Sequence, residues 1–370
     1  MQKVLTEASN PELARKIIKQ IQKLSLTYKE KNGRIPALME VCGSHTMALA
    51  RTGIKRILHE DVRLISGPGC PVCVTDQKSI DSMIELAKQK NRIVCTFGDM
   101  MRVPGSKGSL TKAKSEGSDI RVVYSPTDAV QIAKQNPTKE VIFLGIGFET
   151  TIPVLLAAIQ MAEQEKVANF SMWLNTKLIE PILTYLLDTG EVNIDGFILP
   201  GHVSMIIGEE SYQFLIEQYK IPGVISGFEA VEMLSSIYKL LKMLIKEEAF
   251  IENDYRSVVS YSGNLIAKKM MSTYLQPIDE AWRGIGVIKN SGLRFKDHYQ
   301  HFDAKKKFNI EVAEPVKTKC RCGEIIRGLI LPEECSLFGT ACTPIKPIGP
   351  CMVSSEGTCA AHYTYLREVN

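Results

Sequence analysis

The stretch EVIFLGIGFETTIPVLLAAIQMAEQE, residues 140–165, decides the fold class of this chain. It begins with a run of apolar and β-branched residues, Glu140–Leu144, which is typical of a buried strand. Gly145 and Gly147 follow, and the apolar residues of Thr151–Glu165 then recur at helical spacing. A strand, a glycine loop and a helix in this order are the repeating unit of parallel sheets that helices cover.

The same pattern recurs on both sides of that stretch. Other short apolar runs lie at Val62–Ser66, Arg92–Thr96, Gly196–Leu199 and Gly223–Ser226. Each of them is followed by a loop that contains glycine. Segments with helical spacing separate them, at Asp76–Gln89, Ser125–Gln135, Lys177–Thr189 and Ala230–Lys246. Ligands of such proteins bind beyond the carboxyl ends of the parallel strands, which is where all these glycine loops are expected.

The length of 370 residues exceeds what one hydrophobic core usually supports, so several domains are expected. We predict an α/β protein with two layered parallel-sheet βα domains in series, residues 51–165 and 166–283. The third domain is expected to be loop-rich and stapled by an iron–sulfur cluster. It combines residues 1–50, with the N-terminal helix and the first thiol motif, and the C-terminal tail, residues 284–370. The tail has too little periodicity to bury a core alone, so a metal is expected to order it.

Composition excludes several classes of protein. Hydrophobic residues make up 45% and charged residues 23% of the chain, as in ordinary soluble proteins. The net charge is +4 and no dense Lys/Arg run occurs, so we expect no nucleic-acid partner. No apolar run reaches 18 residues and Met1–Ile21 lacks a signal-peptide pattern, which predicts no membrane partner and a cytoplasmic location. In a reducing compartment the ten cysteines are expected to be metal ligands or redox thiols.

Six of these cysteines crowd into the C-terminal tail. They are Cys320, Cys322, Cys335, Cys342, Cys351 and Cys359. Structural zinc sites usually use two close cysteine pairs, whereas the tail has one close pair, with C-x-C spacing, and more thiols than one tetrahedral metal can bind. A [4Fe–4S] cluster on four thiolates, with two further cysteines as a redox pair, accounts for the count better. Zinc remains the alternative.

The division of the six thiols follows from a resemblance to ferredoxin:thioredoxin reductase. There, C-x-C motifs deliver one cysteine to a cluster and the other to a nearby disulfide. The resemblance implies four cluster ligands, Cys320, Cys335, Cys342 and Cys359. It also implies that Cys322 and Cys351 form the dithiol. Exchanging members between the two sets would not contradict the sequence.

Two further thiol motifs lie near the N-terminus. Cys42 and His45 belong to VCGSHT, residues 41–46, and the sequence Cys70-Pro-Val-Cys73 follows a predicted strand and opens a predicted helix. A helix N-terminus favours the thiolate, so we expect Cys70 and Cys73 to be functional rather than merely buried in a tight turn. His45 suits a hydrogen bond to a bound group better than metal ligation. Cys95, within an apolar run, is expected to be a core residue.

Together these motifs resemble the HypD family of hydrogenase maturation factors over nearly the whole chain. The resemblance is carried by MEVCGSHT (39–46), GPGCPVCVT (67–75), TFGDMMRVPGS (96–106), GFETT (147–151), PGHVS (200–204) and GFE (227–229). The tail adds CRCGEIIRG, ECSLFG, CTP and GPCMVSSEGTCAA. Each motif is weak alone, but the ordered set is specific.

The resemblance implies a scaffold and redox protein in [NiFe]-hydrogenase maturation, rather than a metabolic enzyme. With a HypC-like chaperone it is expected to assemble the Fe(CN)2CO unit, with cyanide from a HypE-like donor, for the hydrogenase large subunit. Cys42 is the implied ligand of the mononuclear iron, Cys70 and Cys73 are the nearby thiol pair, and His45 and Asp99 are neighbours of the site. The cluster and dithiol of the tail are expected to supply electrons.

Two rival functions remain open. One is a thiol–disulfide reductase, similar to ferredoxin:thioredoxin reductase, that carries no mononuclear iron. The other is a zinc-stapled interaction protein without a redox role.

Overall fold

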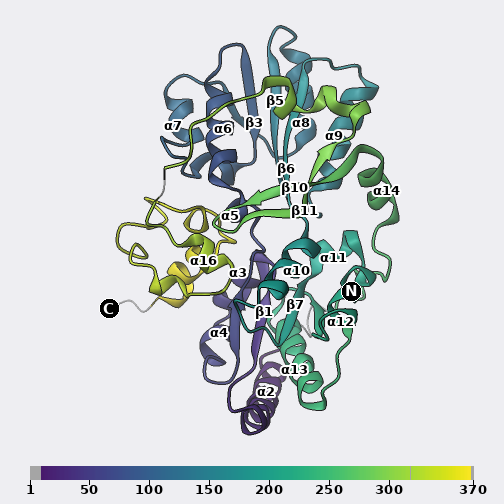
Figure 1. Cartoon of the computed structure of the whole chain (residues 1–370), viewed down its shortest axis with the longest axis vertical. Coiled ribbons are helices and arrows are strands. Elements are labelled where there is room, and N and C mark those ends of the chain that lie inside the picture. Colours follow the sequence, from purple (N-terminus) through teal and green to yellow (C-terminus); the bar gives the residue numbers. More distant parts are fainter. Residues whose placement is uncertain (1–9, 317, 368–370) are drawn as a thin grey trace.

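The computed structural model describes residues 10–316 and 318–367, which form two parallel sheets, a hairpin and a tail of short turns (Figure 1). The first sheet has the strand order β2-β1-β7-β8-β9, with bounds Arg63–Ser66, Ala37–Glu40, Gly196–Pro200, Gly223–Ser226 and Ile251–Asn253. The second has the order β4-β3-β5-β6, with bounds Ile120–Val122, Arg92–Thr96, Glu140–Gly147 and Phe170–Thr176. Every neighbouring pair within these two sheets is parallel. The predicted α/β class with parallel sheets is therefore confirmed.

The central unit of the second sheet follows the sequence pattern closely. Strand β5 is buried from Val141 to Gly147, and helix α9, Ile152–Gln164, starts directly after the glycine loop. Apolar side chains of both elements share one core, including Phe143 and Leu156. The other helices of this half of the molecule are α6 (Gln77–Lys88), α7 (Leu110–Ser115) and α8 (Pro126–Gln135).

The order of the strands differs from the expected series of two domains. Strands β1 and β2 precede the whole second sheet in sequence, yet β1 pairs with β7 in the first. The predicted boundary at 165/166 falls between α9 and β6, and β6 pairs with β5 along its whole length. Periodicity identifies strands but not their partners, which are chosen by the packing of apolar faces distant in sequence.

The N-terminal helix α2, Pro11–Asn32, packs against α13, Ala230–Lys246, and not against the tail (Figure 1). Ile21 of α2 is fully buried in the core that these helices share with the first sheet. The apolar side of α2 is therefore covered by α13, on the side of the first sheet. The following helix α3, Gly43–Arg51, does contact the tail at α17, Thr358–Ala361.

Several shorter helices connect these elements. They are α4 (Ile54–Ile57), α5 (Pro71–Val74), α10 (Ile179–Thr189), α11 (Gly201–Ile207), α12 (Gln213–Glu217), α14 (Leu265–Tyr274) and α15 (Ala304–Phe308), with the 3-10 turns η1 (Gly98–Arg102), η2 (Glu209–Tyr212) and η3 (Asp297–Phe302). None of the helices among the described residues is long and apolar enough to cross a membrane.

An antiparallel hairpin joins the sheets to the tail. Its strands are β10, Leu275–Trp282, and β11, Gly286–Phe295, and the predicted boundary at 283/284 lies at its tip. The tail beyond it forms only short helical turns within the described residues. These are α16 (Cys322–Ile326), η4 (Pro332–Glu334), η5 (Pro350–Met352), α17 and η6 (His362–Leu366).

Candidate functional site

Cys42 lies at the carboxyl end of β1, as the N-cap of α3. Its carbonyl accepts a hydrogen bond from the Thr46 N–H at 3.0 Å, which closes the first helical turn. Burial raises the pKa of the half-buried Cys42 thiol to about 11, although the backbone N–H of His45 partly opposes this. The thiol is therefore protonated at neutral pH in the metal-free protein, and a bound metal would have to displace that proton.

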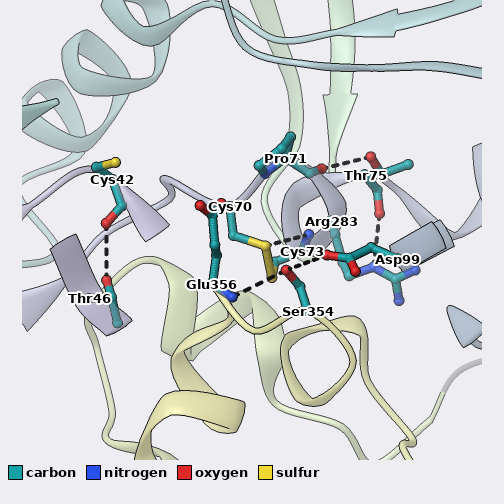
Figure 2. The surroundings of a disulfide bond; sticks show 10 residues. All are labelled: Cys42, Thr46, Cys70, Pro71, Cys73, Thr75, Asp99, Arg283, Ser354 and Glu356. Carbon is teal, nitrogen blue, oxygen red and sulfur yellow. Dashed lines mark hydrogen bonds between the residues drawn. A yellow bond between two sulfur atoms is a disulfide. The ribbon is translucent and has the colours of Figure 1, made fainter. Parts of the chain in front are cut away.

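The Cys70–Cys73 pair lies at the carboxyl end of the neighbouring strand β2. The two residues form a disulfide with a Cα–Cα distance of 5.2 Å (Figure 2). Cys70 caps the single turn of α5, and its sulfur accepts a hydrogen bond from the Cys73 N–H at 3.2 Å. The expected helix start at this motif is thus confirmed.

The two motifs lie against each other because β1 and β2 are neighbours in one sheet. The Gly43 N–H donates to Gly69 O at 3.3 Å. A Cβ atom on Gly69 would lie 2.4 Å from the Cα of Cys42, a separation that real Cβ atoms do not adopt. Glycine at position 69 therefore permits the close approach of the Cys70 loop to Cys42.

His45 is buried beside this edge and is held by two other loops. Its Nε2 lies 2.9 Å from the carbonyl oxygen of Gly227, while its Nδ1 is buried with no hydrogen-bond partner among the described residues. Phe228 stacks on the His45 ring at 4.7 Å and on the His202 ring at 4.1 Å. The segments 41–46, 200–204 and 227–229 thus meet in space.

The protonation state of His45 follows from its burial. Desolvation lowers its pKa to about 4, so the ring is neutral at physiological pH. A neutral ring that donates from Nε2 to a carbonyl leaves Nδ1 with a free lone pair. His45 can therefore accept a hydrogen bond at Nδ1 while it remains neutral.

Asp99 lies on η1 and is exposed, at the point where the tail meets the second sheet. Its carboxylate accepts a hydrogen bond from the Ser354 hydroxyl at 3.2 Å. The guanidinium of Arg102, also on η1, donates to the carbonyl oxygens of Val353 at 3.3 Å and Pro344 at 3.4 Å. This turn therefore anchors the tail loop that lies beside the disulfide.

The same tail loop carries Glu356, a residue that the sequence did not single out. Its carboxylate accepts a hydrogen bond from the Ser44 hydroxyl at 2.5 Å, and a Cβ on Gly43 would lie 2.6 Å from the Glu356 Cβ. Glu356 thus contacts the Cys42 motif, while its own N–H donates to Ser354 at 3.3 Å. The only sequence signal was its place between two tail cysteines.

Five of the six tail thiols line one pocket. They are Cys320, Cys322, Cys335, Cys342 and Cys359. Its other walls are largely apolar, with Leu337, Phe338 and Met352 among them. A Cβ on Gly349 would lie 2.5 Å from the sulfur of Cys320, so a larger side chain there would fill the space beside the thiols. Several soft thiol ligands in an apolar enclosure fit an iron–sulfur cluster.

The thiols around this pocket differ in their pKa values. Hydrogen bonds from the Cys322 and Cys351 thiols lower the pKa of Cys359 and favour its thiolate. The thiol of Cys322 raises the pKa of Cys320, and burial raises that of Cys342. Cys351 is fully buried, and its thiol contacts both Cys322 and Cys359. Nowhere in residues 10–316 and 318–367 are three His, Cys, Asp or Glu side chains arranged to hold a single metal ion.

The tail thiols adjoin the Cys70–Cys73 pair through packed helices. Helix α5, which carries Cys73, packs against α16, which begins at Cys322, and against η5, which contains Cys351. All three residues belong to one buried cluster of side chains. The structure therefore brings the predicted dithiol, Cys322 and Cys351, next to the predicted N-terminal thiol pair.

Two further buried residues, Cys95 and Glu149, lie in or beside the second sheet. Cys95 lies in the core of the second sheet, where burial raises its pKa to about 12, so the core assignment is confirmed. Glu149, which follows β5, accepts a hydrogen bond from the Ile179 N–H at 2.8 Å. Burial raises the pKa of Glu149 to about 7.

Comparisons with known proteins identify the same family as the sequence motifs. A family model described as "HypD: Hydrogenase formation hypA family" matches residues 12–366. The chain is 46% identical over 338 residues to hydrogenase maturation factor HypD2 of Bradyrhizobium diazoefficiens, with 89% of each chain covered. It is 42% identical over 369 residues to HypD of Rhodobacter capsulatus, with 98% of each covered, and 43% identical over 333 residues to HypD of Escherichia coli, with 90% of this chain and 89% of that one covered. The chain therefore belongs to the HypD family of hydrogenase maturation factors.

Proposed function

We propose that this chain assembles the Fe(CN)2CO unit of [NiFe]-hydrogenases in the cytoplasm, as a scaffold that also supplies electrons. Its partners are a HypC-like chaperone, a HypE-like cyanide donor and, indirectly, the hydrogenase large subunit. The observation that carries the proposal is the meeting of Cys42, the Cys70–Cys73 pair and the tail thiols at one edge of the first sheet. Family membership supports the maturation role.

Cys42 is the protein ligand of the iron that is being assembled. A single half-buried thiolate leaves coordination positions open for cyanide, CO and a ligand from the chaperone. His45 has an unpartnered Nδ1 and stays neutral, so it can accept a hydrogen bond from a group bound at this edge, while the proton that iron displaces from Cys42 passes to solvent.

The Cys70–Cys73 pair provides the two electrons that release cyanide from a thiocyanate. The sulfur–carbon bond of the thiocyanate breaks, cyanide and a thiolate leave, the Cys70–Cys73 disulfide forms, and the two thiol protons are released. The pair is then restored by exchange with Cys322 and Cys351, whose own disulfide forms as the first one breaks. The packing of α5 against α16 and η5 supports this exchange.

A [4Fe–4S] cluster is bound in the tail by Cys320, Cys335, Cys342 and Cys359, and the position of all four in the lining of one pocket supports this assignment. Such a cluster supplies electrons one at a time, which would regenerate the Cys322–Cys351 dithiol. The ionised state favoured at Cys359 suits a residue that binds iron as a thiolate.

Complementation tests the scaffold function. We expect Cys42→Ala to abolish hydrogenase maturation in a host that lacks its own HypD-family protein. The control Cys95→Ala removes a core thiol far from these motifs and is expected to retain most maturation. Full maturation with Cys42→Ala would contradict the scaffold function.

The second candidate is a thiol–disulfide reductase without carried iron, favoured by the packing of α5 against α16 and η5. Infrared spectroscopy of the chain purified anaerobically with its HypC-like partner separates the two functions. Absorption bands of iron-bound cyanide and CO that are lost in Cys42→Ala support the scaffold. A complex without mononuclear iron supports the reductase.

A further inference from the structure

The tip of the β10–β11 hairpin lies against the Cys70–Cys73 motif. The backbone N–H of Arg283 donates to Val74 O at 2.9 Å, and Trp282 forms an antiparallel bridge with Thr75. Val74 and Thr75 directly follow Cys73 in the sequence. The hairpin tip is therefore held by backbone contacts to the first thiol motif.

The same tip also contacts the C-x-C motif of the tail. A Cβ on Gly284, whose φ is +66°, would lie 2.5 Å from the Cα of Gly323. Gly323 directly follows Cys322, and a Cβ on Gly323 would in turn lie 2.6 Å from the Cα of Gly284. Two glycines therefore let the backbones of the hairpin and the C-x-C motif touch.

The side chain of Arg283 is fixed at this junction. Its Nε donates to Thr75 O at 2.9 Å, and its Nη1 donates to the side-chain oxygen of Gln77 at 2.7 Å. The third nitrogen, Nη2, is buried and has no hydrogen-bond partner in the described part of the chain. No carboxylate among the described residues forms an ion pair with Arg283, and its Nη2 remains free to interact with a group bound or formed nearby.

The charges around the disulfide give this cation a role. Of the residues drawn in Figure 2, Asp99 and Glu356 carry carboxylates and Arg283 carries the guanidinium. Reduction breaks the Cys70–Cys73 bond with two electrons and produces thiols that ionise in part. Nearby carboxylates disfavour that negative charge, whereas a guanidinium favours it.

We propose that Arg283 is a positioning residue of the electron relay, which holds the hairpin tip between the two thiol motifs and stabilises the reduced state of the Cys70–Cys73 pair. This role rests on the proposed function, in which the pair is oxidised and then restored by Cys322 and Cys351. Arg283 itself exchanges no electrons or protons. Its charge shifts the equilibrium between the disulfide and the dithiol.

A redox titration tests this role. The full chain, purified anaerobically, is equilibrated at pH 8.5 with mixtures of reduced and oxidised dithiothreitol, then alkylated, and the Cys70–Cys73 disulfide is quantified by mass spectrometry. In Arg283→Met we expect the equilibrium constant for reduction to fall on the order of tenfold, about 30 mV for a two-electron couple. Arg283→Lys keeps the charge and is expected to stay within about threefold of wild type.

The matched control is Arg327→Met. Arg327 donates to Gly323 O at 3.1 Å, beside the same C-x-C motif, but its charge is paired with Glu191. We expect the equilibrium constant for reduction of the Cys70–Cys73 disulfide to be unchanged in Arg327→Met. If Arg283→Met does not fold, Arg283→Gln removes the charge and can still donate to Thr75.

Two outcomes overturn the role of Arg283. One is an equilibrium constant for reduction in Arg283→Met and Arg283→Gln that equals that of the wild type. The other is a fall of this constant in Arg283→Lys as large as in Arg283→Met, which would show that the hydrogen bonds of Arg283 matter and its charge does not. The relay itself is judged separately on the wild-type chain. If its Cys322–Cys351 dithiol does not reduce the Cys70–Cys73 disulfide, the proposed function fails regardless of Arg283.

Discussion

The carboxyl edge of the first sheet and the C-terminal tail both gather thiols, but they are built differently. At the sheet edge, neighbouring strands β1 and β2 end together, and backbone contacts place Cys42 beside the Cys70 loop. Beyond β11 the described part of the tail contains no strand, and five of its six cysteines are buried. Backbone contacts of the fold therefore order the sheet edge, whereas we expect the tail to be ordered by a group that its thiols bind.

The largest effect is expected from removing a cluster ligand of the tail. We predict that Cys335→Ala abolishes cluster binding and hydrogenase maturation, and exposes the tail to protease while the sheets stay resistant. Iron and sulfide analysis with limited proteolysis checks this, and Cys95→Ala is the control. A Cys335→Ala variant with full iron content and a protease-resistant tail would show that the tail does not need this ligand for its order.

At the sheet edge, His45 makes stability depend on pH. Its folded pKa of about 4 lies below the ordinary value of 6.5, so the unfolded chain binds the proton first as pH falls. The contribution of His45 to the free energy of unfolding is fully present above pH 6.5. It falls by roughly 3 kcal/mol as the pH drops from 6.5 to 4.

The measurement is urea unfolding at several pH values, compared with His45→Gln. Glu149 has a raised pKa of about 7 and acts in the opposite sense, because its stabilisation is lost as pH rises from 4.5 to 7. The difference between wild type and His45→Gln isolates the histidine. A difference that does not change with pH would show that folding does not lower the pKa of His45.

Gly69→Ala tests the contact between the Cys70 loop and Cys42 at the sheet edge. The added methyl group would meet the Cys42 backbone, so we expect a loss of about 1–3 kcal/mol in the free energy of unfolding. Gly98→Ala is the matched control, because its Cβ would lie 3.8 Å from the nearest atom, on Val122. Equal stability of the two variants would show that the Cys42 and Cys70 loops are not in contact.

The smallest effect is expected where the two regions are joined. Arg102→Ala removes the hydrogen bonds from η1 to Val353 and Pro344 and should cost about 1 kcal/mol. Hydrogen exchange should speed up in the tail segment 344–353 but not in strand β3. Unchanged exchange in that segment would mean that other contacts hold the tail.

What could be predicted from the sequence was local. The strand–loop–helix pattern around Gly145 and Gly147 identified the α/β class, and Pro71 after Cys70 marked a helix start. Both depend on residues within one turn or one strand of each other.

What the sequence did not reveal depends on contacts between distant segments. The pairing of β1 with β7 joins residues about 160 positions apart in the chain, and no periodicity encodes such a choice. Glu356 and Arg283 lie in loops, where position is decided by what the loop packs against. Their contacts with Ser44 and Thr75 became visible only with the fold.

The relay from the tail to the sheet edge requires that electrons reach Cys70 and Cys73 through Cys322. The cluster-loaded chain is reduced, freed of reductant and alkylated, and the state of Cys70 and Cys73 is read by mass spectrometry in wild type and in Cys322→Ser. We predict that both thiols are alkylated in the wild type and remain a disulfide in Cys322→Ser. Equal reduction of the pair in the two proteins would contradict the account.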